Sequence, residues 1–78
     1  MTLFEGEKDL SYEIKGIHVE ENINRRLEAM GMNDKTVVNI LNKKRNGAMI
    51  IKVRGTRLAL GKQITCGIEV SEVIDEKN

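Results

Sequence analysis

Histidine and cysteine are the side chains in this sequence best suited to metal binding or nucleophilic chemistry, and each occurs once, as His18 and Cys66. A structural zinc site uses four Cys or His ligands, and a non-haem Fe(II) site uses two histidines and a carboxylate. One residue of each type meets neither requirement. His18 alternates with Ile17 and Val19 along an expected strand, so its ring should face solvent, while Cys66 is expected to be a semi-buried thiol. The sequence therefore predicts no metal site and no cofactor.

Other signatures of catalysis are also absent from the sequence. There is no nucleophile motif, no Walker loop and no dinucleotide-binding glycine loop. Gly55 and Gly61 are not followed by a Lys-Ser or Lys-Thr pair, and turns account for them. Glu20 and Glu21 form an acidic pair, but they stand where a helix begins, and the helix dipole favours negative charge there. We predict a protein without catalytic residues.

Basic side chains gather in the middle of the chain, at Lys43, Lys44 and Arg45, and again at Lys52 and Arg54. If the two groups meet across a hairpin, they could bind RNA or an acidic protein surface. The simpler interpretation is a solvated hairpin rim, in which lysines protect an exposed sheet edge. We favour the rim, because the chain's two aromatic residues are not interleaved with the basic ones and offer no platform for stacked bases. No nucleic-acid partner is expected.

Length and composition predict one small domain spanning residues 1–78, with a core over about 10–70 and a loose tail over 71–78. With one Phe, one Tyr and no Trp, the core must be aliphatic. No segment approaches the roughly 20 apolar residues that span a bilayer, and charges close to Met1 are unlike a secretory signal. A lone cysteine, unable to form an internal disulfide, agrees with a reducing compartment. We expect a cytoplasmic protein that is not inserted in a membrane.

One short helix is predicted over 22–30, and the rest of the chain must position it. Asn22 is a suitable N-cap, and Gly31 suits the left-handed position that ends a helix. Two and a half turns are too few for a stable isolated helix, so it must lie on a sheet. Its apolar positions share one face at helical spacing: Ile23, Leu27 and Met30.

The remaining segments predict short β-strands. Alternating or β-branched residues place strands at 12–19, with a bulge at Gly16, and at 36–43, 48–54, 57–60 and 65–70. Asn46-Gly47 and Gly55-Thr56 are expected to form tight turns, and residues 61–64 a single 3₁₀ turn. Five short strands close best as a small, partly open barrel, with the helix covering one opening. The expected core comprises Ile23, Leu27, Ile51, Val53, Leu58 and Leu60.

Three segments in this order resemble a known family. Arg26-Leu27-Glu28-Ala29-Met30-Gly31-Met32 is similar to the "R-L-x-x-L/M-G-L/M" segment of FeoA, the small ferrous iron transport protein A. Residues 51–60 resemble its "I-x-V-x-G-x-x-x-A-L" segment, and Cys66-Gly67-Ile68-Glu69-Val70 resembles its closing "A-x-x-I-x-V". The resemblance implies an SH3-like barrel and a non-catalytic cytoplasmic accessory of FeoB, a membrane transporter with a cytosolic G-protein domain.

If the protein is such an adaptor, its function lies in a surface. We expect the end of the helix and the following turn to meet the turn near residue 55 and form a protein-docking face. The residues assigned to that face are Met30, Gly31, Met32, Lys35, Gly55 and Arg57. Two alternatives remain open: a stand-alone regulatory domain similar to the C-terminal part of iron-dependent repressors, and a small RNA-binding barrel.

Overall fold

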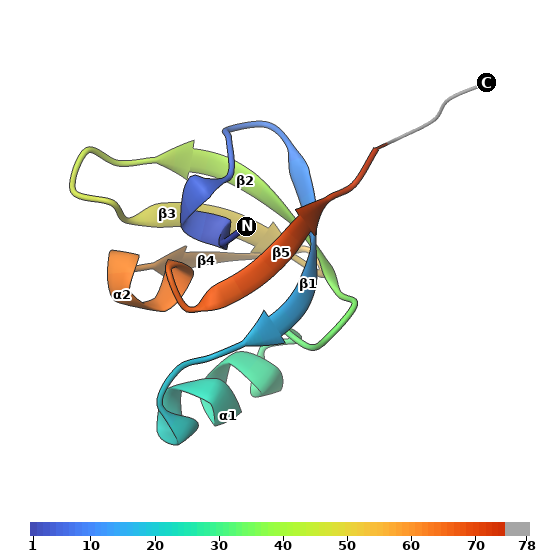
Figure 1. Ribbon diagram of the computed structural model, residues 1–78, viewed down its shortest axis with the longest axis vertical. Coiled ribbons are helices and arrows are strands. Elements are labelled where there is room, and N and C mark those ends of the chain that lie inside the picture. The colour runs from blue at the N-terminus through green and yellow to red at the C-terminus, as the bar shows by residue number, and fades with distance from the viewer. Residues whose placement is uncertain (75–78) are drawn as a thin grey trace.

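The computed structural model describes residues 1–74, which form one curled antiparallel sheet with a helix at one end (Figure 1). The strand order is β4-β3-β2-β1-β5. The predicted class is confirmed: five strands, with the main helix between the first two. Within the described residues no helix is long and apolar enough to cross a membrane. The elements are η1 (Leu3–Glu5), β1 (Ser11–Ile17), α1 (Glu21–Ala29), β2 (Val37–Lys43), β3 (Met49–Val53), β4 (Thr56–Leu60), α2 (Lys62–Thr65) and β5 (Ile68–Glu72).

The bulge predicted at Gly16 is present in β1. The pairing of β1 with β5 shifts register between Ile14 and Gly16. Tyr12 and Ile14 are buried before the shift, and Ile17 packs against the core after it. Side chains alternate between the two faces of a strand, so in a regular strand Ile17 would face away from Tyr12 and Ile14. The extra residue at the bulge turns Ile17 back to their face. The strand then ends at Ile17, so His18 follows it and is not in a strand as predicted.

Two hairpins join β2, β3 and β4, and both turns differ from the expected geometry. At Asn46-Gly47 only the glycine has a positive φ, of 93°. The second turn is formed by Arg54 (φ 50°) and Gly55 (φ 80°), not by Gly55-Thr56. Two successive positive φ values are those of a type I′ turn, whose twist matches that of the strands it joins. Thr56 therefore becomes the first residue of β4.

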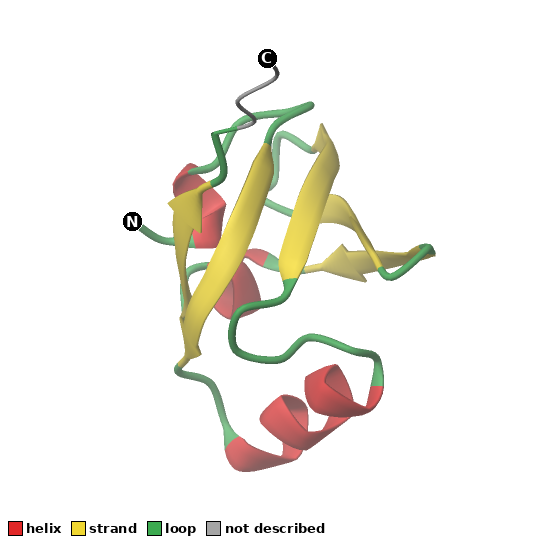
Figure 2. Cartoon of the chain, turned by 90° about the vertical axis from the view of Figure 1, so that its right-hand side faces the viewer, coloured by secondary structure: helices red, strands yellow, loops and turns green. Residues whose placement is uncertain are grey.

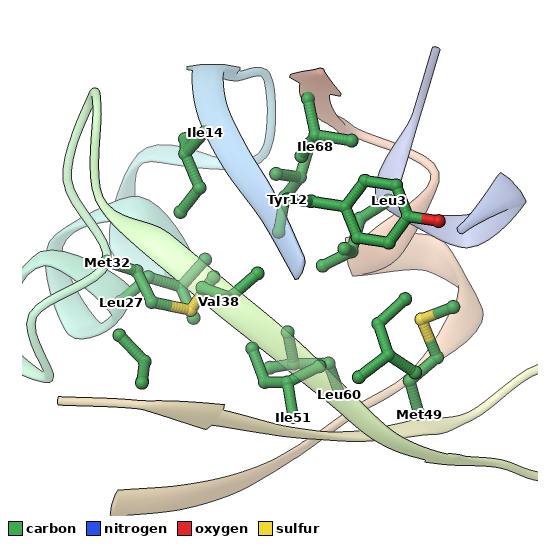
Figure 3. Close-up of a cluster of buried hydrophobic side chains, with 13 residues drawn as sticks. Leu3, Tyr12, Ile14, Leu27, Met32, Val38, Met49, Ile51, Leu60 and Ile68 are labelled. Carbon is green, nitrogen blue, oxygen red and sulfur yellow. The ribbon is translucent and has the colours of Figure 1, made fainter. Parts of the chain in front are cut away.

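The core is one cluster, aliphatic apart from Tyr12, to which every strand, α1 and the N-terminal segment contribute (Figure 3). Leu27, Ile51, Val53 and Leu60 are buried as predicted, whereas Ile23 and Leu58 are only half-buried. The N-terminal segment is packed, because Leu3 is fully buried in the cluster.

Three predictions near the end of the chain were wrong. Residues 62–65 form a short α-helix and not a 3₁₀ turn, and β5 begins at Ile68 and not at 65. The buried Thr65 belongs to α2, where its hydroxyl donates to the Lys62 carbonyl over 3.2 Å. At the other end, β5 continues to Glu72, so the predicted loose tail does not start at 71. Residues 75–78 of that tail lie outside the described residues.

Candidate functional site

Helix α1 lies at one end of the curled sheet, beyond the end of β1 (Figures 1 and 2), and it shares a groove with Ala59 and Leu60 of β4. It begins at Glu21, one residue earlier than predicted, and its N-cap is Glu20 and not Asn22. Leu27 is its only buried residue; Ile23 is half-buried and Met30 is 40% exposed. The sheet thus covers only part of the apolar face, and the remainder borders a groove.

The end of α1 is a Schellman motif built around Gly31. The N–H of Gly31 donates to the Glu28 carbonyl over 3.0 Å, and the N–H of Met32 donates to the Leu27 carbonyl over 2.9 Å. Gly31 has φ of 94°, in the left-handed region where a side chain is disfavoured. The predicted glycine stop is confirmed.

The same motif corrects one predicted site residue. Met32 was assigned to the docking face, but it is fully buried and lies beside Leu27 and Val38 (Figure 3). In a Schellman motif the residue after the glycine packs back on the last helical turn, so Met32 must cover Leu27. The glycine signal that ended the helix could have predicted this burial. Met32 is therefore a core residue and cannot contact a partner.

The structure brings together the two segments that the other five predicted residues occupy. A Cβ on Gly31 would lie 2.7 Å from Cδ of Arg54, so the Arg54 side chain passes directly over the Gly31 backbone. Lys35, Gly55 and Arg57 are exposed, and so is Met30. The end of α1 and the β3–β4 turn thus share one surface, although sequence reasoning had not included Arg54 itself.

A groove separates α1 from β4 and α2. Its deeper part has a volume of about 240 Å³ and is lined by Ile23, Arg26, Leu27, Met30, Ala59, Leu60 and Ile64. A wider part of about 550 Å³ continues past Ile23 and Ile64 to His18, Glu20 and Lys62. One end is therefore mostly apolar with Arg26 in its lining, and the other end combines apolar side chains with the charged Glu20 and Lys62 and with His18. Of the residues that line the deeper part, only Met30 was predicted for the docking face.

The two residues with potential metal chemistry are both exposed. The main-chain N–H of His18 donates to the Gly67 carbonyl over 2.6 Å, and its ring lies over Gly16. Cys66 is exposed and not semi-buried, because it caps α2 and lies in the turn between α2 and β5. Among residues 1–74, no group of three or more His, Cys, Asp or Glu side chains is placed to hold a metal ion.

The hairpin of β2 and β3 contacts the N-terminal segment through Lys43. This contact places Phe4 among basic residues, contrary to the prediction from the sequence that the aromatic and basic residues are not interleaved. Nζ of Lys43 donates to the carbonyl of Gly6 over 2.8 Å and to that of Phe4 over 3.3 Å. It also lies 5.7 Å from the centre of the Phe4 ring, and Nζ of Lys62 lies 5.2 Å from it. Phe4 is therefore interleaved with basic residues. Its half-buried ring already contacts two ammonium groups, which compete with a stacked base.

Comparison with known proteins agrees with this architecture. A family model described as the FeoA domain matches residues 1–72. No curated protein matches the sequence significantly. The FeoA-like protein of Clostridium acetobutylicum is 25% identical, with a TM-score of 0.81 over 100% of this chain and 92% of that one.

Two further structures place the fold in a wider context. FeoA of Stenotrophomonas maltophilia, described as a prokaryotic SH3 domain protein and solved in complex with zinc, is 26% identical, with a TM-score of 0.78 over 91% of this chain and 89% of that one. A manganese-dependent transcriptional repressor is 13% identical with a TM-score of 0.84, and the match covers 94% of this chain but only 41% of the repressor. The predicted SH3-like fold is confirmed, and the repressor match is one of fold alone.

Proposed function

This chain belongs to the FeoA domain family, and from that premise we propose that it is a cytoplasmic, non-catalytic accessory protein of ferrous iron uptake that binds the cytosolic part of a FeoB-type membrane GTPase transporter. The groove between α1 and β4 supports this proposal most strongly. A helix of nine residues normally buries its apolar face, yet Ile23 is half-buried and Met30 is 40% exposed. Apolar surface beside exposed arginines is typical of protein-binding sites.

The chemistry of the described residues favours binding over catalysis. The exposed His18 has no carboxylate or thiol arrangement around it that could form a metal site with three protein ligands. The groove is lined mainly by aliphatic side chains, with Arg26 and Lys62 at its two ends. Such a surface can hold a polypeptide by burial and charge, and within residues 1–74 no side-chain hydrogen bond or ion pair joins His18 to Glu20, the two titratable groups that share its wider part.

The proposal is tested with the purified cytosolic part of the FeoB-type transporter from the same organism, in titration calorimetry with and without a GTP analogue. Met30→Asp and Arg57→Asp should each weaken binding by roughly tenfold or more, which is about 1.4 kcal/mol. Lys44→Asp is the matched control, since Lys44 is an exposed cation in the β2–β3 turn, outside the groove. It should bind as the wild type does.

Two results would contradict the proposal. If the wild-type chain does not bind the transporter part in either nucleotide state, the partner is a different protein. If Lys44→Asp weakens binding as much as Arg57→Asp does, attraction is a general charge effect and not a property of the docking face. Retention on RNA that salt abolishes would instead support the RNA-binding alternative.

A further inference from the structure

The two outer strands of the sheet differ in what covers them. The outer side of β5 is occupied by the N-terminal segment: Thr2 forms a bridge with Glu69, and the N–H of Val70 donates to the Met1 carbonyl over 2.8 Å. At the other end of the sheet, β4 pairs with β3 on one side, and within residues 1–74 no strand pairs with its other side. One edge is therefore closed and the other is open.

The register identifies the open hydrogen-bonding groups of β4. Val53 faces Thr56 across the two-residue turn, so these two form a hydrogen-bonded pair. Bonding then alternates along the ladder, and Thr56, Leu58 and Leu60 direct their backbone groups toward β3. The N–H and C=O groups of Arg57 and Ala59 consequently point away from the sheet. An added strand would pair with these two residues.

The open edge borders the apolar groove. Ala59 and Leu60 form one wall of the groove, and Ile23, Leu27 and Met30 of α1 form the opposite wall. A strand laid along β4 would therefore place alternate side chains between β4 and the helix. This combination of main-chain pairing and side-chain pockets is how sheet edges recognise extended peptides.

The charges around this edge specify the kind of segment it would accept. Arg26 lines the groove, Arg57 lies on β4 itself, and Arg54 lies in the adjoining turn. The ion pairs among residues 1–74 join Met1 to Glu69, Lys15 to Glu13 and Arg25 to Glu21, and none includes these three arginines. Glu20 is at the far end of the groove. The edge beside Arg57 therefore favours carboxylates on the incoming strand.

We propose that β4 is the docking edge for an acidic, extended polypeptide segment, which adds to the sheet as a strand through the backbone of Arg57 and Ala59 and inserts apolar side chains between β4 and α1. This inference rests on the proposed function for the identity of the partner that carries the segment. The mode of binding follows from the edge, the groove and the three arginines.

The test uses the full chain labelled with ¹⁵N and two blocked synthetic peptides, one alternating valine with glutamate and one alternating valine with lysine. The glutamate peptide should slow amide hydrogen exchange at Arg57 and Ala59 at least tenfold, and the lysine peptide should not. Ala59→Pro should abolish the effect, because proline removes an outward N–H without breaking the ladder to β3. Ala59→Ser keeps that N–H, so its response should clearly exceed that of Ala59→Pro.

A second variant keeps the proposal testable if Ala59→Pro does not fold. Arg57→Glu keeps every backbone group and should weaken the response to the glutamate peptide, since it places a negative charge on β4 and leaves only Arg26 and Arg54 to attract carboxylates. The proposal is overturned if the glutamate peptide leaves exchange at Arg57 and Ala59 unchanged, or if both peptides act alike on the wild type. Slowing that depends on protein concentration alone would assign the edge to a second copy of this chain.

The peptide experiment tests strand addition at β4, and the transporter experiment tests the proposed function, so one proposal can be refuted without the other. Transporter binding that is equal in Ala59→Pro and Ala59→Ser would leave the proposed function intact and refute strand addition. A positive peptide result without any transporter binding would support the docking edge and refute the proposed partner.

Discussion

Met32 offers the sharpest test of how this molecule is built, because its neighbour in the sequence, Met30, provides a matched control. Met32 is fully buried, whereas Met30 is 40% exposed. Truncating a buried methionine to alanine removes its transfer free energy and leaves a cavity, at a cost of about 2–5 kcal/mol. A domain of this size has a total stability of roughly 4–12 kcal/mol. Met32→Ala should therefore remove a large share of it.

Thermal unfolding monitored by circular dichroism measures the difference. Each kcal/mol shifts Tm by about 4–8 °C in domains of this length, so a cost of about 3 kcal/mol lowers Tm by roughly 12–24 °C. Met30→Ala should shift Tm by only a few degrees, since Met30 is 40% exposed and does not belong to the buried cluster. Met32→Asp should prevent folding altogether, because it buries a carboxylate with no partner.

The refuting result is specific. If Met32→Ala and Met30→Ala shift Tm equally, or if Met32→Asp folds with a dispersed ¹H–¹⁵N spectrum, the Schellman motif does not hold Met32 against Leu27. In that case Met32 would return to the docking face, where sequence reasoning placed it.

Three further predictions concern stability and ionisation. Leu27→Ala should lower the unfolding free energy by about 2–5 kcal/mol in urea titration, because it leaves a cavity beneath α1; an unchanged midpoint would contradict its burial. Gly31→Ala should cost about 1–2 kcal/mol from the left-handed φ and displace the Arg54 side chain, which chemical shifts of the guanidinium report. The hydrogen bond from the N-terminal amine to Glu69 raises the pKa of that amine, so Glu69→Gln should lower it in NMR titration. The stabilisation from this pair should be complete below the amine's unfolded pKa, near 8, and be lost as pH rises through the folded value.

Local signals in the sequence predicted most of the fold. Gly31 marked the end of the helix, because only a residue without Cβ adopts its φ of 94° at no cost. The change of apolar parity around Gly16 marked a bulge, because a strand can bury both Ile14 and Ile17 only by inserting an extra residue. Each of these signals depends on neighbouring residues and needs no knowledge of distant contacts.

Errors arose where contacts between distant segments decided the outcome. Phe4 is separated from Lys43 and Lys62 by many residues, and only the packing of the N-terminal segment onto the hairpin brings them together. Met32 is an exception, because the glycine that ended the helix could have predicted its burial from local signals alone. The turn between β3 and β4 is formed by Arg54 and Gly55, which both have positive φ. The sequence had suggested Gly55 and Thr56 instead.

By itself, the sequence determined an aliphatic five-strand sheet with one short helix, because periodicity and glycine placement act locally. Only the tertiary structure decided that β4 keeps an open edge beside a half-covered helix, and that Arg26, Arg54 and Arg57 gather around it. These residues come from different elements, and the curl of the sheet sets their separation. The sequence had already assigned Arg57 to the docking face, but the open edge and the positions of Arg26 and Arg54 follow from packing, which no local pattern reveals.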